Sequence, residues 1–265
     1  MSHGDEKRFE DFFQEGKYIA LKNHLYNYTL RKRAIERILE HETIDLVLEV
    51  GSGISPVMTR TERIVYSELS PRALRTLKAI QGGKGWYVAA DSTRLPFADG
   101  AFSHAIGSEV FEHVERDQQA LDELGRVLVS GGELIVTFPH RKRYFANDDR
   151  FVNHFRRYEL HEMEEKLRTA GLRPFVVRKI LGPLEKATMM VTCFVASRME
   201  RDDKSAQPTA RSSVFMRYVV APVFKWCNVL YAALAALDAA LVPQRLAAVL
   251  LIRSRKIGEG AQDTA

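Results

Sequence analysis

The feature that most constrains this chain is a pair of closely spaced glycines directly after a short apolar run. The run is Val47-Leu48-Glu49-Val50, and Gly51-Ser52-Gly53 follows it. It predicts a buried strand, and the glycines predict a tight turn in which the backbone can adopt positive φ and approach a ligand. Ligands of open α/β sheets bind at the carboxyl ends of the strands, where the strand order reverses. A glycine turn alone is equally typical of an ordinary strand-to-loop connection, so its meaning depends on the segments that follow.

Strand-like and helical segments alternate along the rest of the chain. Ser70 and Pro71 suit the N-cap and the first position of one helix, and a short helix beginning near Pro56 is expected before the second strand. This alternation predicts a parallel sheet with helices on both faces. The predicted strands are 43–50, 63–68, 85–91, 101–107, 133–139, 172–180 and 247–253, and the longer helices are 8–40, 71–80 and 117–129.

Several short motifs occur in a fixed order along these elements. They lie at residues 49–53, 68, 91–92, 95–97, 99–102, 108–114, 128–134 and 154–158. In this order they resemble the class I S-adenosylmethionine-dependent methyltransferases, especially the small-molecule, type 11-like group, and the likeness covers residues 43–180. The resemblance implies a Rossmann-like sheet of seven strands, mostly parallel, and S-adenosylmethionine as the cofactor.

The acids that end the strands are the expected cofactor contacts. The resemblance implies that Glu68 accepts the ribose hydroxyls and that Asp91 accepts the exocyclic amine of adenine. The glycines of the turn let the backbone approach the amino-acid tail. The alternative role of each acid is to keep the end of a strand in contact with solvent. The occurrence of three acids at successive strand ends argues against this alternative. The predicted cofactor-binding residues are Glu49, Gly51, Ser52, Gly53, Glu68, Leu69, Asp91, Ser92, Ser108 and Glu109.

A nicotinamide dinucleotide is the alternative cofactor. An acid about 20 residues beyond the glycines would suit either ligand. The dinucleotide fingerprint needs a third glycine where this chain has Pro56. The proline and the later motifs therefore favour S-adenosylmethionine.

Histidines are the candidates for a catalytic base. Methyl transfer is an in-line displacement that depends on holding the two reactants together, and a hydroxyl acceptor also needs a base. His140 follows the strand at 133–139 and is the first choice, with His113 and His154 as the others. An ordinary loop position explains His140 equally well, a structural role explains His113 equally well, and Glu112 is a weaker candidate. No metal is expected, because the two cysteines lack metal-ligand spacing.

Positive charge collects near the expected site. The net charge is +5 and the pI about 9.2, and residues 140–144 and 150–158 are basic and aromatic. A phosphate-bearing acceptor, an anionic membrane surface and a solvated basic face all explain such segments. Nucleic acid is not expected as a partner, because the chain shows no accessory binding module.

A long apolar insertion separates the last two predicted strands. Residues 214–242 carry an apolar stripe at helical spacing, flanked by positive charge, but charged and polar residues interrupt it. A simple transmembrane helix is therefore not expected. We expect contact with a membrane surface, and packing against the core or against a second subunit in a homodimer is the alternative. The predicted division is an N-terminal helical segment at 1–42, a core at 43–180 and 244–256, and the insertion at 181–243.

Together these features predict a methyltransferase that acts on a small-molecule, lipid-linked or otherwise amphipathic acceptor. The few cysteines and the lack of a secretory signal favour a cytoplasmic protein, peripheral on the inner face of a membrane. The alternative is a non-catalytic scaffold of the same fold that binds a partner through its insertion.

Overall fold

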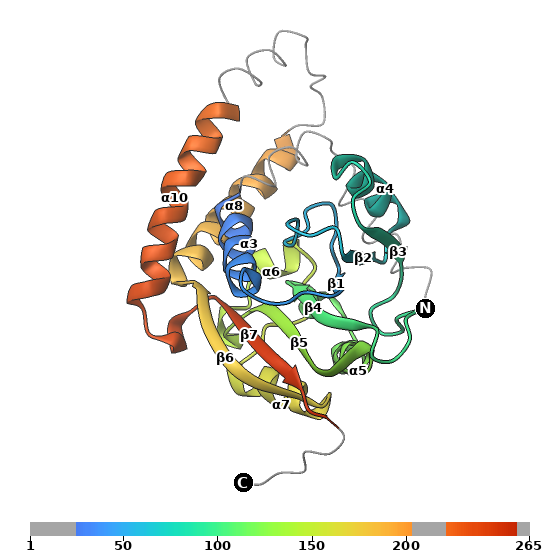
Figure 1. Ribbon diagram of the computed structural model, residues 1–265. Helices are drawn as coiled ribbons and strands as arrows, with labels where there is room; N and C mark the ends of the chain where they lie inside the picture. Colours follow the sequence, from blue (N-terminus) through green and yellow to red (C-terminus); the bar gives the residue numbers. More distant parts are fainter. Residues whose placement is uncertain (1–24, 203–220, 259–265) are drawn as a thin grey trace.

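Seven strands form one sheet in the order β3-β2-β1-β4-β5-β7-β6 (Figure 1). The structure is a computed structural model that describes residues 25–202 and 221–258. Strands β1 to β5 pair in parallel, whereas β7 runs antiparallel between β5 and β6. The predicted mostly parallel sheet is confirmed. The strands are β1 Val47–Val50, β2 Ile64–Glu68, β3 Trp86–Ala89, β4 Phe102–Ser108, β5 Leu128–Pro139, β6 Leu172–Leu181 and β7 Val249–Lys256.

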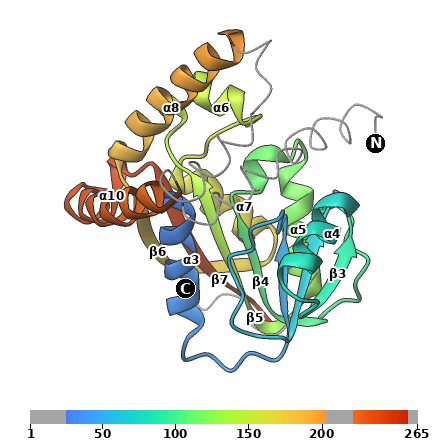
Figure 2. The ribbon, with the colours of Figure 1, turned by 90° about the horizontal axis from the view of Figure 1, so that it is seen from above.

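Helices cover both faces of the sheet, as predicted (Figures 1 and 2). Apolar side chains of α5 (Asp117–Val127) and α7 (Leu160–Thr169) pack on one face. Those of α3 (Tyr26–Leu39), α4 (Pro71–Ile80) and α10 (Ala221–Leu241) pack on the other. The predicted helix at 8–40 is confirmed where it is described, and its residues 8–24 lie outside the described part of the chain.

The short helix predicted after the glycine turn is wrong. Residues 51–63 form an irregular loop between β1 and β2. The buried Glu49 carboxylate accepts hydrogen bonds from the backbone N–H of Val57 at 2.7 Å and of Met58 at 3.0 Å. Tyr28 donates its hydroxyl to the carbonyl of Pro56 at 2.7 Å. Side chains from outside the loop thus satisfy backbone groups that a helix would otherwise pair.

Two helices, α8 (Pro183–Asp202) and α10, lie between β6 and β7 in the chain. Helix α10 turns small, buried residues towards the domain, namely Ala232, Ala235 and Ala239. Its contacts with neighbouring helices include a hydrogen bond from the Leu184 backbone N–H to Asp238 at 2.9 Å. Residues Phe224–Leu241 are long and apolar enough to cross a membrane, by length and composition only. The boundaries of the predicted insertion, and those of the other two divisions, stay a prediction.

The remaining described elements are short and connect these layers. Helix α6 (Asn147–Phe151) lies against α8, and the 3-10 turn η2 follows the end of β4 (Figure 2). The 3-10 turns are η2 Phe111–His113, η3 Lys142–Tyr144 and η5 Gln244–Leu246.

Candidate functional site

The carboxyl ends of four neighbouring parallel strands meet at one edge of the sheet. Val50 pairs with Ser67 of β2 and with Gly107 of β4, so the residues that follow each of them leave the sheet side by side. Strand order reverses between β1 and β4. The structure therefore brings the glycine turn, Glu68 and Ser108 together at the position where open α/β sheets bind ligands.

Glu68 holds the two loops that border this edge. Its carboxylate accepts the N–H of Gly53 at 3.0 Å and the N–H of Ser70 at 3.2 Å. Gly51 and Gly53 both adopt positive φ, at 60° and 53°, as the predicted turn requires. Because carboxylate oxygens can each accept more than one hydrogen bond, Glu68 keeps capacity for ribose hydroxyls.

Asp91 follows β3 at the same edge. Its Oδ1 atom accepts both the backbone N–H and the hydroxyl of Thr93, each at 2.8 Å. This Asx-type turn fixes the carboxylate, whose other oxygen remains available as an acceptor. The half-buried side chains of Leu69 and Ser92 lie on the adjoining loops, and Ser52 is buried within the glycine turn.

Glu49 lies near the carboxyl end of β1, and its side chain is buried. It is 3% exposed and faces the side of the sheet covered by α3. Burial raises its pKa to about 8, against the opposing effect of the hydrogen bonds from Val57 and Met58. Its geometry gives it a structural role in holding the β1–β2 loop, and direct contact with a cofactor stays a prediction.

Ser108 and Glu109 end β4 next to the glycine turn. The Ser108 hydroxyl lies 2.9 Å from that of Thr137. Glu109 has a positive φ of 55°, which is uncommon outside glycine and typical of functional sites. Its carboxylate forms an ion pair with Arg31 of α3 at 3.6 Å, which brings helix α3 to the site.

Comparison with known proteins finds a similar domain in the central part of the chain. A family model described as a methyltransferase domain matches residues 48–136. An uncharacterized methyltransferase of Mycobacterium sp. (strain JLS) is 32% identical over 113 residues, which are 41% of this chain and 44% of that protein. A demethylmenaquinone methyltransferase of Thermus thermophilus is 30% identical over 114 residues, 40% of this chain and 52% of that protein. The matches thus span about half the length of these relatives.

Residues 48–136 are thus similar to the domain of class I S-adenosylmethionine-dependent methyltransferases. Solved structures agree on the fold: a Thermotoga maritima protein described as a possible histamine N-methyltransferase superposes with a TM-score of 0.62 at 18% identity, covering 95% of this chain and 99% of that one. The [4+2]-cyclase SpnF superposes with a TM-score of 0.55 at 21% identity, covering 86% and 82%. At such identities the likeness concerns the fold alone.

The cofactor of this family is S-adenosylmethionine, which supplies an electrophilic methyl group. The strand-end residues of this chain fit it chemically. Glu68 offers acceptors for a ribose diol, and Asp91 offers one for an adenine amine. Gly51 and Gly53 adopt the positive φ that the tight turn beside them needs. The individual contacts stay predictions.

A charged cavity lies beside this edge. It measures about 160 Å³ and is lined by α3, α6, α8 and the ends of β4 and β5. Arg31, Glu109, His154, Arg157 and Lys186 all contribute to its wall. A larger hollow of about 510 Å³ lies between α5 and α7, but it contains none of the predicted site residues. Of these two hollows, only the cavity at the strand ends contains predicted site residues, namely Glu109 and His154.

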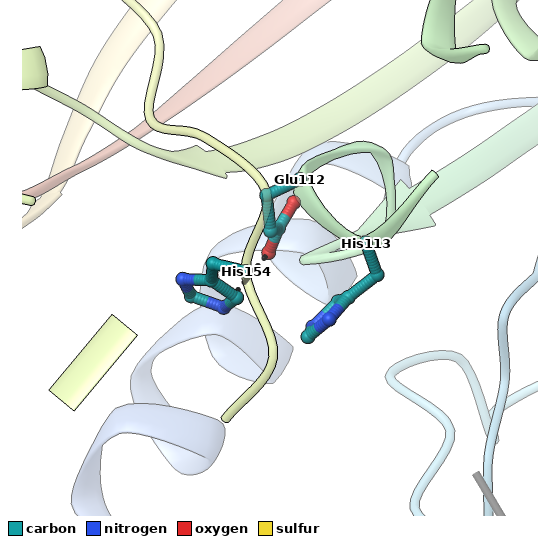
Figure 3. A group of neighbouring side chains, drawn as sticks. All are labelled: Glu112, His113 and His154. Carbon is teal, nitrogen blue, oxygen red and sulfur yellow. Dashed lines mark ion pairs between the residues drawn. The ribbon is translucent and has the colours of Figure 1, made fainter. Parts of the chain in front are cut away.

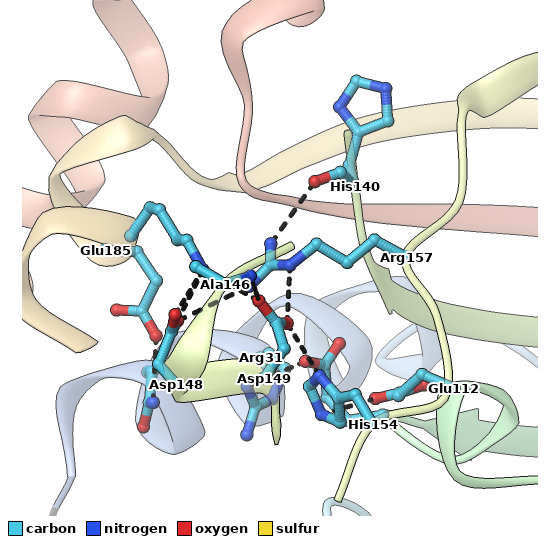
Figure 4. A network of polar contacts seen from close by, with 12 residues as sticks. Arg31, Glu112, His140, Ala146, Asp148, Asp149, His154, Arg157 and Glu185 are labelled. Carbon is cyan, nitrogen blue, oxygen red and sulfur yellow. Dashed lines mark hydrogen bonds and ion pairs between the residues drawn. The ribbon is translucent and has the colours of Figure 1, made fainter. Parts of the chain in front are cut away.

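Buried charges organise this cavity into one network (Figure 4). The Lys186 ammonium contacts both oxygens of Asp148, at 2.6 and 2.7 Å, and Asp149 at 2.8 Å. Arg157 donates to Asp149 at 2.6 Å, and the ring of His154 lies 2.9 Å from the same oxygen. Burial acts to raise the pKa of Asp149, but the hydrogen bond from His154 and the charge of Arg157 outweigh it and hold that pKa well below its usual range.

The three predicted base candidates occupy different surroundings. His140 is 3% exposed, its Nδ1 lies 2.9 Å from the carbonyl of Ala247, and its ring points away from the network (Figure 4). Burial lowers the pKa of His140, against the raising effect of that carbonyl. His154 lines the cavity and His113 packs against it, with ring centroids 4.7 Å apart. The geometry favours His154 over His140 as a base, although either role stays a prediction.

The sequence analysis missed several charged residues of the site. Lys186 lies in an apolar helix, and Asp149 lies between the two basic segments. The lysine was an available signal, because a lysine within an apolar helix needs a buried partner. Arg157 belongs to the predicted basic segment, but nothing in the sequence indicates that it would be buried.

Proposed function

We propose that this chain transfers a methyl group from S-adenosylmethionine to an amphipathic acceptor at a membrane surface. The observation that carries the proposal is a charged cavity at the strand ends directly next to an apolar outer surface. Helix α8 contributes to both. Its residues Lys186 and Met189 line the cavity, whereas Met190, Val191 and Phe194 are 51–64% exposed on its other side.

Helix α10 extends this apolar surface. Its large side chains face outward and are 55–75% exposed, although they would normally be buried. Moving one such side chain out of water is worth about 1 kcal/mol, given 1.5–3 kcal/mol for a whole Leu or Phe. The exposed residues are Trp226, Val229, Leu230, Leu234, Leu237 and Leu241.

The helix lies on the domain rather than projecting from it. Asn228 accepts a hydrogen bond from the N–H of Tyr26 at 3.1 Å, and Lys179 donates to the carbonyl of Ala240 at 3.1 Å. A helix held along its inner face can rest in the interfacial plane with its outer face in the lipid. The exposed Lys225 and Arg245 near its two ends favour an anionic surface.

The relatives give limited support for the acceptor. The Thermus thermophilus relative is named for demethylmenaquinone. The wall of the cavity, where Arg31, Arg157 and Lys186 are each paired with an acid, suits a polar head, and the surface beside it suits an apolar chain. The alternative is a scaffold that keeps the fold without catalysis and binds a partner through its apolar insertion.

Calorimetric titration with S-adenosylmethionine tests the cofactor step. We expect binding that Glu68→Gln and Asp91→Asn weaken at least roughly tenfold, since each removes an acceptor for a buried donor. A folded protein that does not bind the cofactor would contradict the enzymatic proposal and favour the scaffold. Methyl transfer from labelled cofactor into a lipid extract then tests the acceptor class.

Sedimentation with anionic phospholipid vesicles tests the membrane step. We expect Leu230→Glu combined with Leu234→Glu to reduce the bound fraction at least roughly tenfold. The double variant loses two apolar side chains and gains two negative charges that an anionic membrane repels. Ile80→Glu on α4 is the matched control, since Ile80 is 48% exposed outside this surface. If the double variant sediments like the wild type but loses a dimer, the surface is a subunit interface instead.

A further inference from the structure

Three potential metal ligands meet where η2 passes the loop between α6 and α7. Glu112 and His113 lie on η2, and His154 lies on the loop that follows α6. One ligand atom from each residue lies within 4.8 Å of the others. The side chains point towards one another (Figure 3). A backbone hydrogen bond from Phe155 to the carbonyl of Glu112, at 2.8 Å, holds the two segments together.

The carboxylate in this group lacks the partners that a buried charge needs. Glu112 is 0% exposed, and neither of its carboxyl oxygens has a hydrogen bond in the described structure. The Nε2 atom of His154 lies 3.8 Å from Oε1 of Glu112. A buried carboxylate without hydrogen bonds is costly unless it is protonated or binds a cation.

Both histidines are oriented through their Nδ1 atoms. The Nδ1 of His154 lies 2.9 Å from Asp149, and the Nδ1 of His113 lies 3.3 Å from the carbonyl of Asn153. These oxygens can only accept, so each Nδ1 carries the proton. The lone pair of a neutral ring is then on Nε2. Metal-binding histidines are usually fixed in this way by a carboxylate or a carbonyl.

We propose that Glu112, His113 and His154 bind one divalent transition-metal ion. Two imidazoles and one carboxylate suit zinc, cobalt, manganese or iron(II) better than magnesium or calcium, which prefer all-oxygen ligands. Ligand atoms around a zinc ion lie roughly 3.4 Å apart, given metal–ligand distances of about 2.1 Å. Side-chain rotations that move each ligand atom by about 1 Å would bring the three atoms from their present spacing to this one. The site adjoins the cavity through His154.

Metal binding by the untagged, full-length chain tests the proposal without reference to methyl transfer. After dialysis against a chelator, calorimetric titration with zinc chloride should give one site per chain. Cobalt chloride should produce visible d–d absorption bands that zinc abolishes. Zinc binding should be weakened by roughly 10–100-fold or more in each of the variants Glu112→Gln, His113→Ala and His154→Ala. Losses of roughly 10–100-fold already follow when a residue that only hydrogen-bonds to a metal ligand is replaced.

His161→Ala is the matched control, because His161 is exposed on α7 and outside the group. It should leave the zinc affinity unchanged. Circular dichroism of each variant shows whether it is folded, and Glu112→Gln is the variant that best preserves shape and packing. Absence of a stoichiometric zinc or cobalt site in the folded wild type would overturn the proposal. Binding that persists unchanged in all three variants would overturn it too.

Discussion

Replacing Lys186 by Met should remove the centre of the buried charge network. Lys186 is 7% exposed, and its ammonium makes three contacts of 2.6–2.8 Å with Asp148 and Asp149. Without it, Asp148 retains only a 3.9 Å ion pair with Arg157. Breaking one side of a buried ion pair costs about 3–5 kcal/mol, because the other charge stays buried without compensation. We expect the free energy of unfolding to fall by this amount, a large part of a typical total of about 5–15 kcal/mol.

Urea denaturation followed by circular dichroism measures the loss. The double variant Lys186→Met, Asp148→Asn removes both charges, so its destabilisation should be less than the sum of the single variants by about 1 kcal/mol or more. Arg168→Met is the control, since the side chain of Arg168 is 59% exposed in its pair with Glu164, and such pairs contribute about 0–1 kcal/mol. A loss below about 1 kcal/mol for Lys186→Met, or additive single effects, would refute this reasoning.

Three further changes test the strand ends and the loop. Gly51→Ala should destabilise by about 2 kcal/mol in urea denaturation, because φ is 60° and an added Cβ would lie 2.6 Å from Val110. Ser70→Ala should cost about 1 kcal/mol in the same assay, since the Ser70 hydroxyl accepts the N–H of Ala73 at 3.3 Å as the N-cap of α4. The pKa of Glu49 is raised by burial to about 8, so the folded state holds the proton more tightly than the unfolded state, and this contribution to stability is lost as pH rises from about 4.3 through 8. Glu49→Gln should remove that loss, so unfolding midpoints at pH 5, 7 and 9 should fall less with rising pH in the variant than in the wild type.

The sheet was predictable because its signals are local. Each parallel strand is a short apolar run between turn residues, and the Ser70 cap occupies the predicted place at α4. The wrong helix after the glycine turn had a local signal as well, namely Pro56. The helix does not form because tertiary partners bond the backbone of the loop instead. Tyr28, distant in sequence, bonds one carbonyl, and the buried Glu49 bonds two N–H groups. Local propensity gives way where tertiary partners are stronger.

The network around the cavity was not predictable in this way. Its pairs join residues 37 and 38 positions apart, between α6 and α8, and no spacing rule connects such residues. His140 illustrates the same limit. Its place after β5 was read correctly, but hydrogen bonding to Ala247 turns the ring away from the cavity. Direction of a side chain depends on packing, which a strand boundary does not specify.

Helix α8 connects the two properties that the proposed acceptor combines. Its inward residues recur at Glu185, Met189 and Cys193, one per turn, and the first two line the cavity. Met190 and Phe194, each one residue further along the chain and so about 100° around the helix, face the outside. A head group held at the charged wall would therefore lie within one helix diameter, about 10 Å, of an apolar surface. An acceptor with a polar head and an apolar chain satisfies both sides at once, whereas a wholly polar acceptor leaves the exposed apolar face unexplained.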